Sequence, residues 1–279
     1  MKSELTYGSL FSGIGGIDLG MDMAGFECAW QVEIDDYCGE ILEAHWPNTK
    51  RYRDIYKVKG SEVEPVDIIC GGFPCQPVST AGKRGGIDDE RWLWDEFYRL
   101  ICEIRPRWVV AENVPGLLSA NSGRAFAGIL RDLAEGGYDV VWDLFPAGGP
   151  GGVGAPHQRK RVFIVAHTDS SRQHSIRKGE SVQKDREGPK HRSGVTGNVA
   201  HTDSQRRCSR NTKRKNAKDV RQPPRCQIDG QWDVEPDVGR VANGVSNRVG
   251  RLRALGNAVV PQVAYKVARM IHEYTEKEK

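Results

Sequence analysis

The sequence predicts an α/β protein in which a mainly parallel sheet is covered by helices on both faces and is interrupted by one polar insert. Short hydrophobic runs alternate with segments of helical apolar spacing between residues 5 and 166. Two of these runs end in glycine-rich turns, at residues 11–16 and 71–77. The alternation is lost between residues 167 and 230, and apolar periodicity returns before the C-terminus.

The first strand and turn are predicted close to the N-terminus. A hydrophobic run over residues 6–10 enters the sequence FSGIGG at 11–16, and apolar residues at helical spacing follow it. Glycines let a ligand approach the backbone, and the N-terminus of a helix offers unpaired N–H groups. We therefore expect a ligand-binding turn between the first strand and the first helix.

An acidic residue follows the second predicted strand. The run at residues 26–32 predicts this strand, and Glu33 lies 20 residues after Gly13, which is the spacing of an acid that binds ribose hydroxyls. The dinucleotide-binding fingerprint G-x-G-x-x-G requires its third glycine where this chain has Asp18. The pattern thus predicts a ribose-containing ligand without matching the dinucleotide fingerprint.

A cysteine lies on a stiff loop at the end of another strand. Residues 66–70 form a hydrophobic run typical of a buried strand, and GGFPCQP follows at 71–77. Prolines on both sides of Cys75 have fixed φ angles, and the carboxyl end of a strand is where ligands bind in open α/β sheets. An isolated cysteine is usually structural, but these flanking residues favour a functional thiol.

The alternation of elements continues along the chain. It predicts helices over residues 36–46, 93–104 and 124–134 and strands near residues 51–55, 108–111, 138–144 and 162–166. The strand at 108–111 leads directly to Glu112, which should lie on the same sheet edge as Cys75. A last helix is predicted over residues 262–274, with Pro261 at its first position.

The segment from residue 167 to residue 230 is polar and basic. It holds 16 Lys and Arg residues against 7 Asp and Glu, a net charge of +9, whereas the rest of the chain carries −5. It contains no Phe, Trp or Tyr, and the hexapeptide VAHTDS occurs at 165–170 and again at 199–204. A segment this polar builds little core, so we expect a partly disordered insert whose partner is a polyanion.

The composition is that of a soluble intracellular protein. Hydrophobic residues make up 38% and charged residues 28%, and no apolar run approaches the ~20 residues that span a bilayer. The N-terminus lacks the apolar segment of a secretory signal. The seven cysteines are scattered without CxxC spacing, so we expect neither disulfides nor a metal site. We expect a cytoplasmic protein that associates with no membrane.

Five short blocks stand out along the chain, namely FSGIGG at 11–16, GGFPCQP at 71–77, ENVPGLL at 112–118, RKR at 159–161 and RALGNAVVP at 253–261. In sequence and in order they resemble the blocks of the DNA cytosine-5 methyltransferases, with the phage and prophage members most similar. The resemblance implies a Rossmann-like S-adenosylmethionine-dependent methyltransferase sheet, formed by residues 1–166 and 248–279, with the C-terminal helix packed beside the first strand. Residues 167–247 would then be a small, basic, inserted target-recognition domain.

The resemblance also implies a substrate and a set of catalytic residues. The substrate would be a cytosine flipped out of double-stranded DNA, acted on by a monomer in a bacterial or phage-infected cell. Cys75 would attack C6 of the base and make C5 nucleophilic. Glu112, kept protonated by a setting that raises its pKa, would serve N3 of the ring. Arg161 would donate to O2, Arg159 would help hold the site, and Asn113 would support the loop.

The same resemblance implies S-adenosylmethionine as the cofactor. Glu33 would bind its ribose hydroxyls, Ile34 would cover the adenine face, Asp54 would accept from the adenine amino group, and Asn257 would contact the methionine end. The full set of expected cofactor-binding residues is Phe11, Gly13, Gly15, Gly16, Glu33, Ile34, Asp54, Pro74 and Asn257.

Other interpretations stay open at this point. A close branch of the same family methylates transfer RNA with the same Cys, Glu and Arg set, so the polymer could be RNA. A catalytically silent DNA-binding protein of this fold is disfavoured, because a binding protein needs no thiol beside a carboxylate. A nicotinamide oxidoreductase with a reactive cysteine is disfavoured by Asp18 and leaves the basic insert unexplained.

Overall fold

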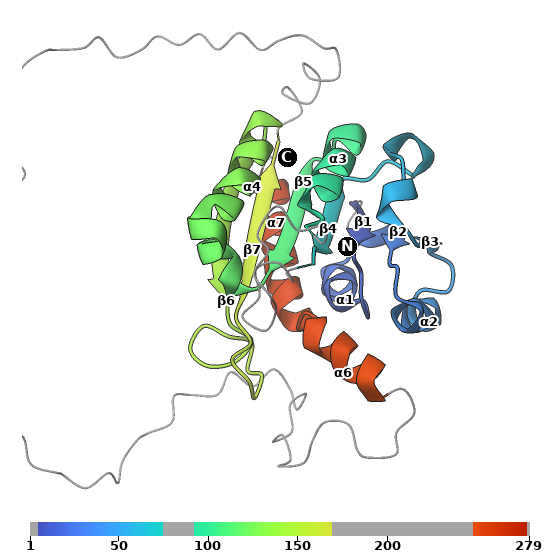
Figure 1. Cartoon of the computed structure of the whole chain (residues 1–279), viewed down its shortest axis with the longest axis vertical. Coiled ribbons are helices and arrows are strands. Elements are labelled where there is room, and N and C mark those ends of the chain that lie inside the picture. Colours follow the sequence, from blue (N-terminus) through green and yellow to red (C-terminus); the bar gives the residue numbers. More distant parts are fainter. Residues whose placement is uncertain (1–4, 75–91, 169–247, 278–279) are drawn as a thin grey trace, which may run out of the picture.

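The computed structural model describes residues 5–74, 92–168 and 248–277. They form a sheet of seven strands in the order β3-β2-β1-β4-β5-β7-β6 (Figure 1). The strands are β1 Thr6–Leu10, β2 Glu27–Val32, β3 Lys50–Tyr52, β4 Ile68–Gly72, β5 Trp108–Asn113, β6 Asp139–Phe145 and β7 Arg161–His167.

The sheet is mainly parallel, as predicted. Strands β3, β2, β1, β4 and β5 pair in parallel, and β7 runs antiparallel between β5 and β6. The strand order reverses between β1 and β4. The carboxyl ends of these two strands therefore border the crevice in which open α/β sheets bind ligands.

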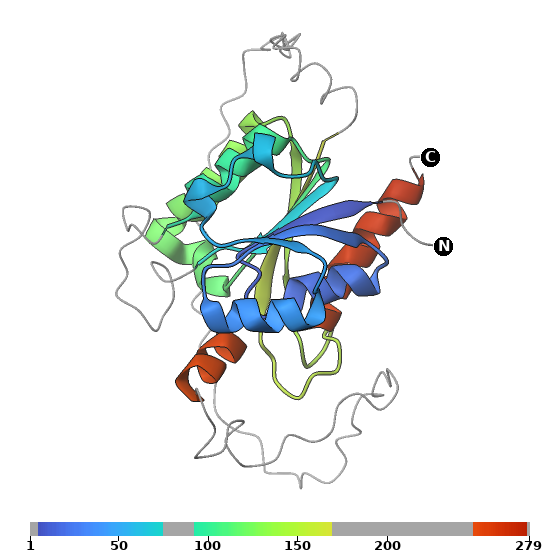
Figure 2. The ribbon, with the colours of Figure 1, turned by 90° about the vertical axis from the view of Figure 1, so that its right-hand side faces the viewer.

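Helices cover both faces of the sheet. Figure 2 shows α3 and α4 on one side and α1 and α7 on the other. Each side has its own buried hydrophobic cluster, one built around α3 and α4 and one around α1 and α7. The helices are α1 Gly16–Met23, α2 Asp36–His45, α3 Trp94–Ile104, α4 Arg124–Glu135, α6 Arg248–Asn257 and α7 Pro261–Lys277, and the 3-10 turns are η1 Ile55–Lys57, η2 Gly60–Glu62 and η4 Pro115–Gly123.

Helix α3 illustrates how the apolar spacing produces this arrangement. Its buried residues recur every three or four positions, at Trp94, Phe97, Leu100, Ile101 and Ile104, so that one face of the helix lies on the sheet. Each side chain of this kind stabilises the fold by about 1.5–3 kcal/mol when it leaves water. The observed helix confirms the prediction for residues 93–104.

The C-terminal helix packs against the first helix, in agreement with the expected return of the chain to the first strand. Helix α7 contributes Ala264, Val267 and Ala268 to the cluster that also contains Tyr7 of β1. The two helices approach closely at Gly20, where an added Cβ atom would lie 2.4 Å from the Cβ atom of Ala264 and 2.7 Å from the carbonyl oxygen of Pro261. Only glycine allows this contact between α1 and α7.

Several boundaries differ from the sequence predictions. Strand β4 spans Ile68–Gly72 and not residues 66–70, and β5 continues through Glu112 to Asn113 and does not end at residue 111. Strand β7 ends at His167 and not at Ala166, and the Thr168 N–H donates to the Arg107 carbonyl oxygen at 3.1 Å, so the sheet extends into the segment expected to be polar insert. Residues 51–55 were predicted as a strand, but β3 ends at Tyr52 because the Asp54 carboxylate accepts from the Tyr56 N–H and caps η1.

Helix α6 was not predicted from the sequence. The block at 253–261 was expected only to lead into the last helix, yet α6 runs to Asn257. Cys75 and the remainder of the predicted insert lie outside the described residues. Among the helices that are described, none combines the length and the apolar character needed to cross a bilayer.

The contact at Gly20 gives a direct test of the α1–α7 packing. We predict that Gly20→Ala destabilises the protein by about 1–3 kcal/mol, because the new methyl group overlaps backbone and side-chain atoms of α7. Gly39→Ala in α2 is the matched control, since nothing lies within 4 Å of its added Cβ atom. It should leave stability unchanged or raise it by up to about 1 kcal/mol. Urea denaturation measures the free energy of unfolding of both variants. Equal values for Gly20→Ala and Gly39→Ala would contradict this packing.

Candidate active site

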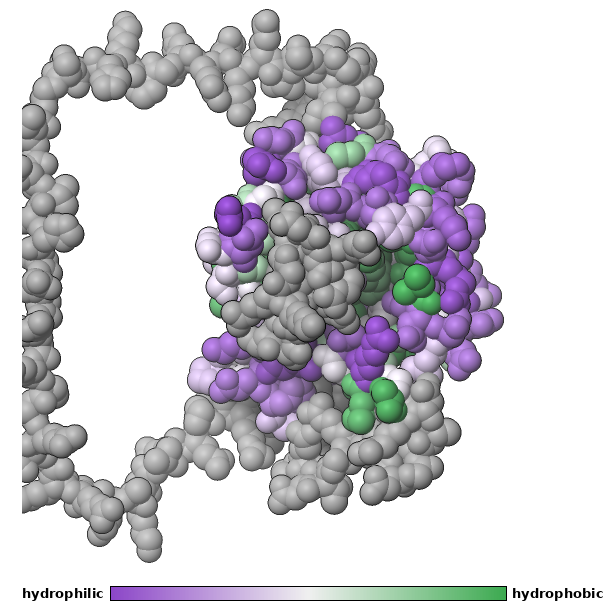
Figure 3. Space-filling view, viewed as in Figure 1, coloured by the Kyte–Doolittle hydropathy of each residue, from purple (hydrophilic) through white to green (hydrophobic). Residues whose placement is uncertain are grey.

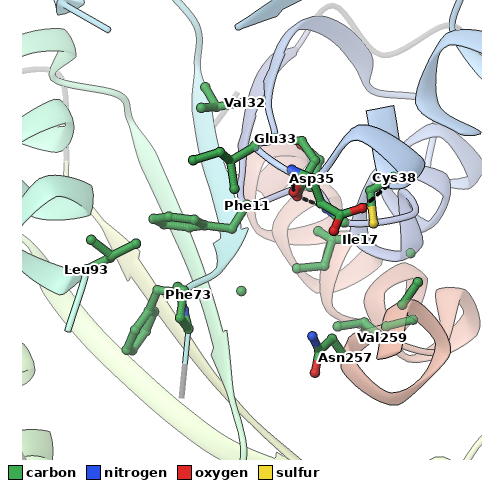
Figure 4. A pocket seen from close by; sticks show the side chains of 18 of the residues that line it. Phe11, Ile17, Val32, Glu33, Asp35, Cys38, Phe73, Leu93, Asn257 and Val259 are labelled. Carbon is green, nitrogen blue, oxygen red and sulfur yellow. Dashed lines mark hydrogen bonds between the residues drawn. The ribbon is translucent and has the colours of Figure 1, made fainter. Parts of the chain in front are cut away.

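A cavity of about 570 Å³ opens at the carboxyl ends of β1, β2, β4 and β5. It is lined by residues that directly follow these strands, namely Phe11, Glu33, Phe73 and Val114, and by the end of α6 (Figure 4). Its size is that of a small-molecule or cofactor site, and it lies where the strand order reverses.

The surface around the cavity is partly apolar. Figure 3 shows one face of the molecule on which hydrophilic side chains predominate and hydrophobic side chains form a few separate patches. Two exposed apolar side chains line the cavity, Ile34 at 68% exposure and Tyr56 at 62%. An apolar rim of this kind suits the flat face of an aromatic ligand.

The turn after β1 has a left-handed backbone. Phe11 and Gly13 have φ angles of 54° and 56°, and Phe11 is one of the few non-glycine residues in this conformation. The Ser12 N–H donates to the Val32 carbonyl oxygen at 3.2 Å, and the Gly13 N–H donates to Glu33 Oε2 at 2.7 Å. The end of β2 thus fixes the turn in a conformation that exposes its backbone to the cavity.

Glu33 is held by backbone donors on both carboxylate oxygens. In addition to the bond from Gly13, Glu33 Oε1 accepts from the Asp35 N–H at 2.8 Å. The Asp35 side chain then accepts from the Cys38 N–H at 3.0 Å and caps α2 (Figure 4). The predicted ribose-binding acid therefore lines the cavity in a fixed orientation.

The far end of the cavity is formed by the segments around Ile34 and Asp54. Arg53 Nη2 donates to the Ile34 carbonyl oxygen at 2.9 Å, which links the two segments. Asp54 Oδ1 accepts from the Tyr56 N–H at 3.1 Å. Ile34 and Asp54, both predicted from the sequence, line the same cavity as Glu33.

The two remaining glycines of the turn have different surroundings. Gly16 lines the cavity, and a Cβ atom there would lie 2.4 Å from the Val259 carbonyl oxygen. Gly15 is not among the lining residues, and a Cβ atom there would lie 2.5 Å from the Trp46 ring. The position of Gly15 indicates close packing of the chain around α2.

Arg159 lies beside the cavity and fastens one of its walls. Its guanidinium donates to the carbonyl oxygens of Leu255, at 3.1 Å, and Gly256, at 2.7 Å, and its Nε donates to that of Ala258 at 3.0 Å. These bonds hold the end of α6, which places Asn257 in the cavity wall. Arg159 is thus a support for the wall rather than a part of its lining.

Glu112 and Arg161 form a buried ion pair in the cavity wall. Arg161 Nε lies 2.9 Å from Glu112 Oε1, and the two side chains are only 13% and 7% exposed. Glu112 pairs in register with Gly72 of β4, where an added Cβ atom would lie 2.5 Å from Glu112 Oε2. Glycine at position 72 therefore leaves the space that the carboxylate occupies.

Burial dominates the acidity of Glu112. Loss of water around the carboxyl raises its pKa to about 7, although the charges of Arg161 and Arg159 act in the opposite direction. A carboxyl group with this pKa exists in both forms near neutral pH and can hold a proton for a ligand. The direction of this shift agrees with the sequence-based expectation, and its cause is burial.

The neighbouring residues connect Glu112 to the loop that contains the predicted nucleophile. Asn113 Nδ2 donates to the Phe73 carbonyl oxygen at 3.2 Å, and Asn113 Oδ1 accepts from the Val114 N–H. Phe73 and Pro74 both line the cavity. Cys75 is the next residue in the chain and lies outside the described residues.

Several lining residues were not identified from the sequence. Ser12 lies within the predicted turn but was given no role, and further examples are Ile17, Asp35, Arg53, Tyr56, Leu93, Arg253 and Val259. Arg53 could have been noticed because it directly precedes Asp54. Leu93 and Val259 come from distant parts of the chain, and only the fold brings them together. Within residues 5–74, 92–168 and 248–277, no cluster of three or more His, Cys, Asp or Glu side chains could hold a metal ion.

The fold and the cavity define a class of protein. It is an α/β protein with a Rossmann-like sheet, whose small-molecule site at the reversal of strand order also contains a buried carboxyl and guanidinium pair. The sequence model of the family described as C-5 cytosine-specific DNA methylase matches residues 5–231, and the chain belongs to this family. The resemblance found in the sequence blocks is confirmed.

Individual relatives agree with this assignment. Type II methyltransferase M.BsuFI of Bacillus subtilis is 36% identical over 168 residues, which cover 60% of this chain and 40% of that protein. Type II methyltransferase M.AquIA of Picosynechococcus sp. is 37% identical over 177 residues, which cover 57% of this chain and 70% of that protein. The chain spans about half the length of most of the curated relatives it matches.

One solved structure supports the same fold. A prophage-encoded protein of E. coli, assigned as a candidate DNA modification methyltransferase, superposes with a TM-score of 0.50 at 30% identity, over 59% of this chain and 47% of that chain. The Rossmann-like methyltransferase sheet predicted from the sequence is thereby confirmed.

Because Arg161 pairs with Glu112, the contribution of Arg161 to the free energy of unfolding should depend on pH. At pH 8, above the raised pKa of Glu112, the carboxylate is ionised and needs Arg161, so we predict that Arg161→Met lowers the free energy of unfolding by about 3–5 kcal/mol. At pH 5 the carboxyl is protonated in the folded protein, and the loss should be smaller.

A surface arginine provides the control for this experiment. Arg131 pairs with Asp132 on the exposed side of α4, so Arg131→Met should have a small effect that is the same at both pH values. Urea denaturation at pH 5 and pH 8 measures all three proteins. A loss for Arg161→Met that is equal at both pH values, or larger at pH 5, would contradict the raised pKa of Glu112.

Proposed function

We propose that this protein transfers a methyl group from S-adenosylmethionine to C5 of a cytosine in double-stranded DNA. The single observation that carries the proposal is that residues suited to bind the cofactor and residues suited to act on the base line the same cavity. One wall holds Glu33, Ile34 and Asp54 around a glycine turn, and the other holds Glu112, Arg161 and Pro74. A cofactor and a base that react with each other need such a shared space.

The cofactor fits the residues that are present. Glu33 offers a carboxylate for ribose hydroxyls, and the exposed Ile34 side chain offers an apolar contact for adenine. Glu33, Asp35 and Asp54 add negative charge to this half of the wall, which suits the positive sulfonium of S-adenosylmethionine. When bound, the cofactor supplies the methyl group as an electrophile. Asn257 would contact its methionine end from α6.

The nucleophile in this proposal is Cys75, which directly follows Pro74 in the chain. Its thiolate forms a bond to C6 of the cytosine, and the electron pair of the C5–C6 double bond becomes available at C5. After C5 has taken the methyl group, its proton leaves to a base or water. The bond from sulfur to C6 then breaks and restores both the double bond and the free thiolate.

Glu112 and Arg161 stabilise the charge that develops on the base. Attack at C6 raises the electron density at N3 and O2, and fixed donors at such atoms are usually the strongest contribution to catalysis. Glu112, with its pKa raised to about 7, would hold a proton at N3, and Arg161 would donate to O2. Arg159 would keep the wall formed by α6 in place.

The partner and the division into domains are part of the same proposal. A cytosine inside a duplex must be flipped out to reach this cavity. Residues 167–247, with their excess of Lys and Arg, would form the inserted target-recognition domain and contact DNA phosphates. Residues 1–166 and 248–279 would form the catalytic domain. We propose that the protein acts as a monomer in the bacterial cytoplasm, because one flipped base needs one active site.

The test is methyl transfer from labelled S-adenosylmethionine to unmethylated genomic DNA, with digestion to nucleosides. We predict label in 5-methylcytosine for the wild type and a loss of at least about 1,000-fold for Cys75→Ala, because no other group can form the adduct. Transfer RNA is assayed in parallel. Label in RNA alone would move the substrate to transfer RNA, and label in neither polymer would contradict the proposed activity.

A further inference from the structure

Asp18 is a carboxylate buried in the core that the proposed reaction does not use. It lies on α1 with 0% exposure. Its Oδ2 accepts from the Ser9 hydroxyl at 3.0 Å, and its Oδ1 accepts from Gln31 Nε2 at 2.9 Å. Asp18 also occupies the position where the dinucleotide fingerprint has its third glycine, so the chain places a charged group where only helix packing is usually required.

The burial of this carboxylate is unfavourable on its own. Within the described residues no ion pair is formed with Asp18, and burial raises its pKa to about 6, while the bonds from Gln31 and Ser9 lower it. A buried ionised group without a cationic partner is costly, and its stability depends on the hydrogen bonds that it accepts. Simple packing between α1 and the sheet would not require such a group.

The two hydrogen bonds join three elements that form the cavity. Ser9 is on β1, Asp18 is on α1, and Gln31 is on β2 two residues before Glu33. The carboxylate therefore connects the segments that present the left-handed turn and the ribose-binding acid. Because an ionised carboxylate only accepts, both Ser9 and Gln31 must point donors toward it.

The network reaches the cavity through a second serine. The Ser12 hydroxyl lies 2.9 Å from the Ser9 hydroxyl oxygen and 3.3 Å from the Ser9 carbonyl oxygen. Since the Ser9 proton is directed to Asp18, the Ser12 hydroxyl donates inward to Ser9. Ser12 lines the cavity between Phe11 and Gly13, both of which have left-handed backbones. An inward anchor at Ser12 holds this strained turn in place.

We propose that Asp18 is a positioning residue, which fixes the turn at Phe11–Gly13 for the cofactor through the hydroxyls of Ser9 and Ser12. The inference rests on the proposed function and adds to it a residue that does not touch the cofactor. Asp18→Asn has nearly the same shape but brings an N–H donor. If this donor faces Ser9, the Ser9 hydroxyl accepts it and turns its own proton to Ser12. The hydrogen bond between the two hydroxyls then reverses direction, and the Ser12 proton is left with the Ser9 carbonyl oxygen, at 3.3 Å, as its inward acceptor.

Tyr7 supplies the matched control. It is also fully buried on β1, and its hydroxyl donates to Asp22 Oδ1 at 2.7 Å and lies 3.1 Å from the Asp18 carbonyl oxygen. Within the described residues the Tyr7 hydroxyl forms no hydrogen bond to Ser9 or Ser12, and Tyr7 is not among the residues that line the cavity. Tyr7→Phe thus removes a buried hydrogen bond next to the same helix without changing the link to the turn.

The experiment measures binding of S-adenosylhomocysteine by isothermal titration calorimetry, and stability by urea denaturation in the absence of ligand. We expect both Asp18→Asn and Tyr7→Phe to lose stability. Asp18→Asn should weaken binding by about tenfold, the effect of one charged hydrogen bond, whereas Tyr7→Phe should change it by less than about twofold. A merely structural role for Asp18 would give the two variants the same binding.

A double-mutant cycle that combines Asp18→Asn with Ser12→Ala tests whether Asp18 affects cofactor binding through Ser12. If Asp18 acts through Ser12, the double variant should bind about as weakly as the weaker of the two single variants. If the losses of affinity of the two single variants multiply in the double variant, the inference is overturned. Unchanged binding by Asp18→Asn would also overturn it. If the wild type itself does not bind S-adenosylhomocysteine, the proposed function fails together with the inference. Binding by the wild type with unchanged binding by Asp18→Asn leaves the function intact and removes only the role of Asp18.

Discussion

The burial of Glu112 beside Arg161 is the interaction on which the proposed reaction side of the cavity depends. Strand β7 runs antiparallel to β5, so its first residue lies beside the last residues of β5. A parallel strand in the same place would begin at the opposite edge of the sheet. The antiparallel direction thus brings the guanidinium of Arg161 to the carboxyl of Glu112. Glycine at position 72 gives the carboxyl its space on the other side.

The side of the cavity that is proposed to bind the cofactor depends on the same sheet edge. Strands β1 and β2 end next to each other, and the residues that follow them hold one another through the bond from the Gly13 N–H to Glu33. The wall opposite is formed by α6, whose end is held by Arg159 from the segment that precedes β7. The segment at 159–161 therefore supports both sides of the cavity. Arg159 holds the end of α6, and Arg161 pairs with Glu112.

Local patterns were sufficient for much of the fold and of the site. The run at residues 6–10 gave β1 its observed bounds, and the spacing from Gly13 to Glu33 identified two residues that are hydrogen-bonded in the structure. Glu112 could be placed because it directly follows the hydrophobic run at residues 108–111, although β5 itself continues to Asn113. In these cases the signal lies within one strand or one turn, where periodicity and backbone sterics decide the conformation.

The features that could not be predicted depend on contacts between distant segments. Helix α6 has no clear apolar face, so its formation depends on neighbours such as Arg159 and not on its own periodicity. His167 reads as the start of a polar segment, but it pairs with Trp108 and Asp139 in the sheet. The use of Asp18 as a buried acceptor was hidden because its partners, Ser9 and Gln31, lie on different strands.

The most direct test of this account is the titration of Glu112 by NMR. Protein labelled with ¹³C at the glutamate side-chain carboxyl is followed from pH 4 to pH 9, and Glu112→Gln identifies the signal that belongs to this residue. The account predicts a midpoint near pH 7, because burial outweighs the two arginines. A midpoint at or below about 4.5, the ordinary range of glutamate, would mean that the arginines outweigh burial and would contradict the role of Glu112 as a proton holder.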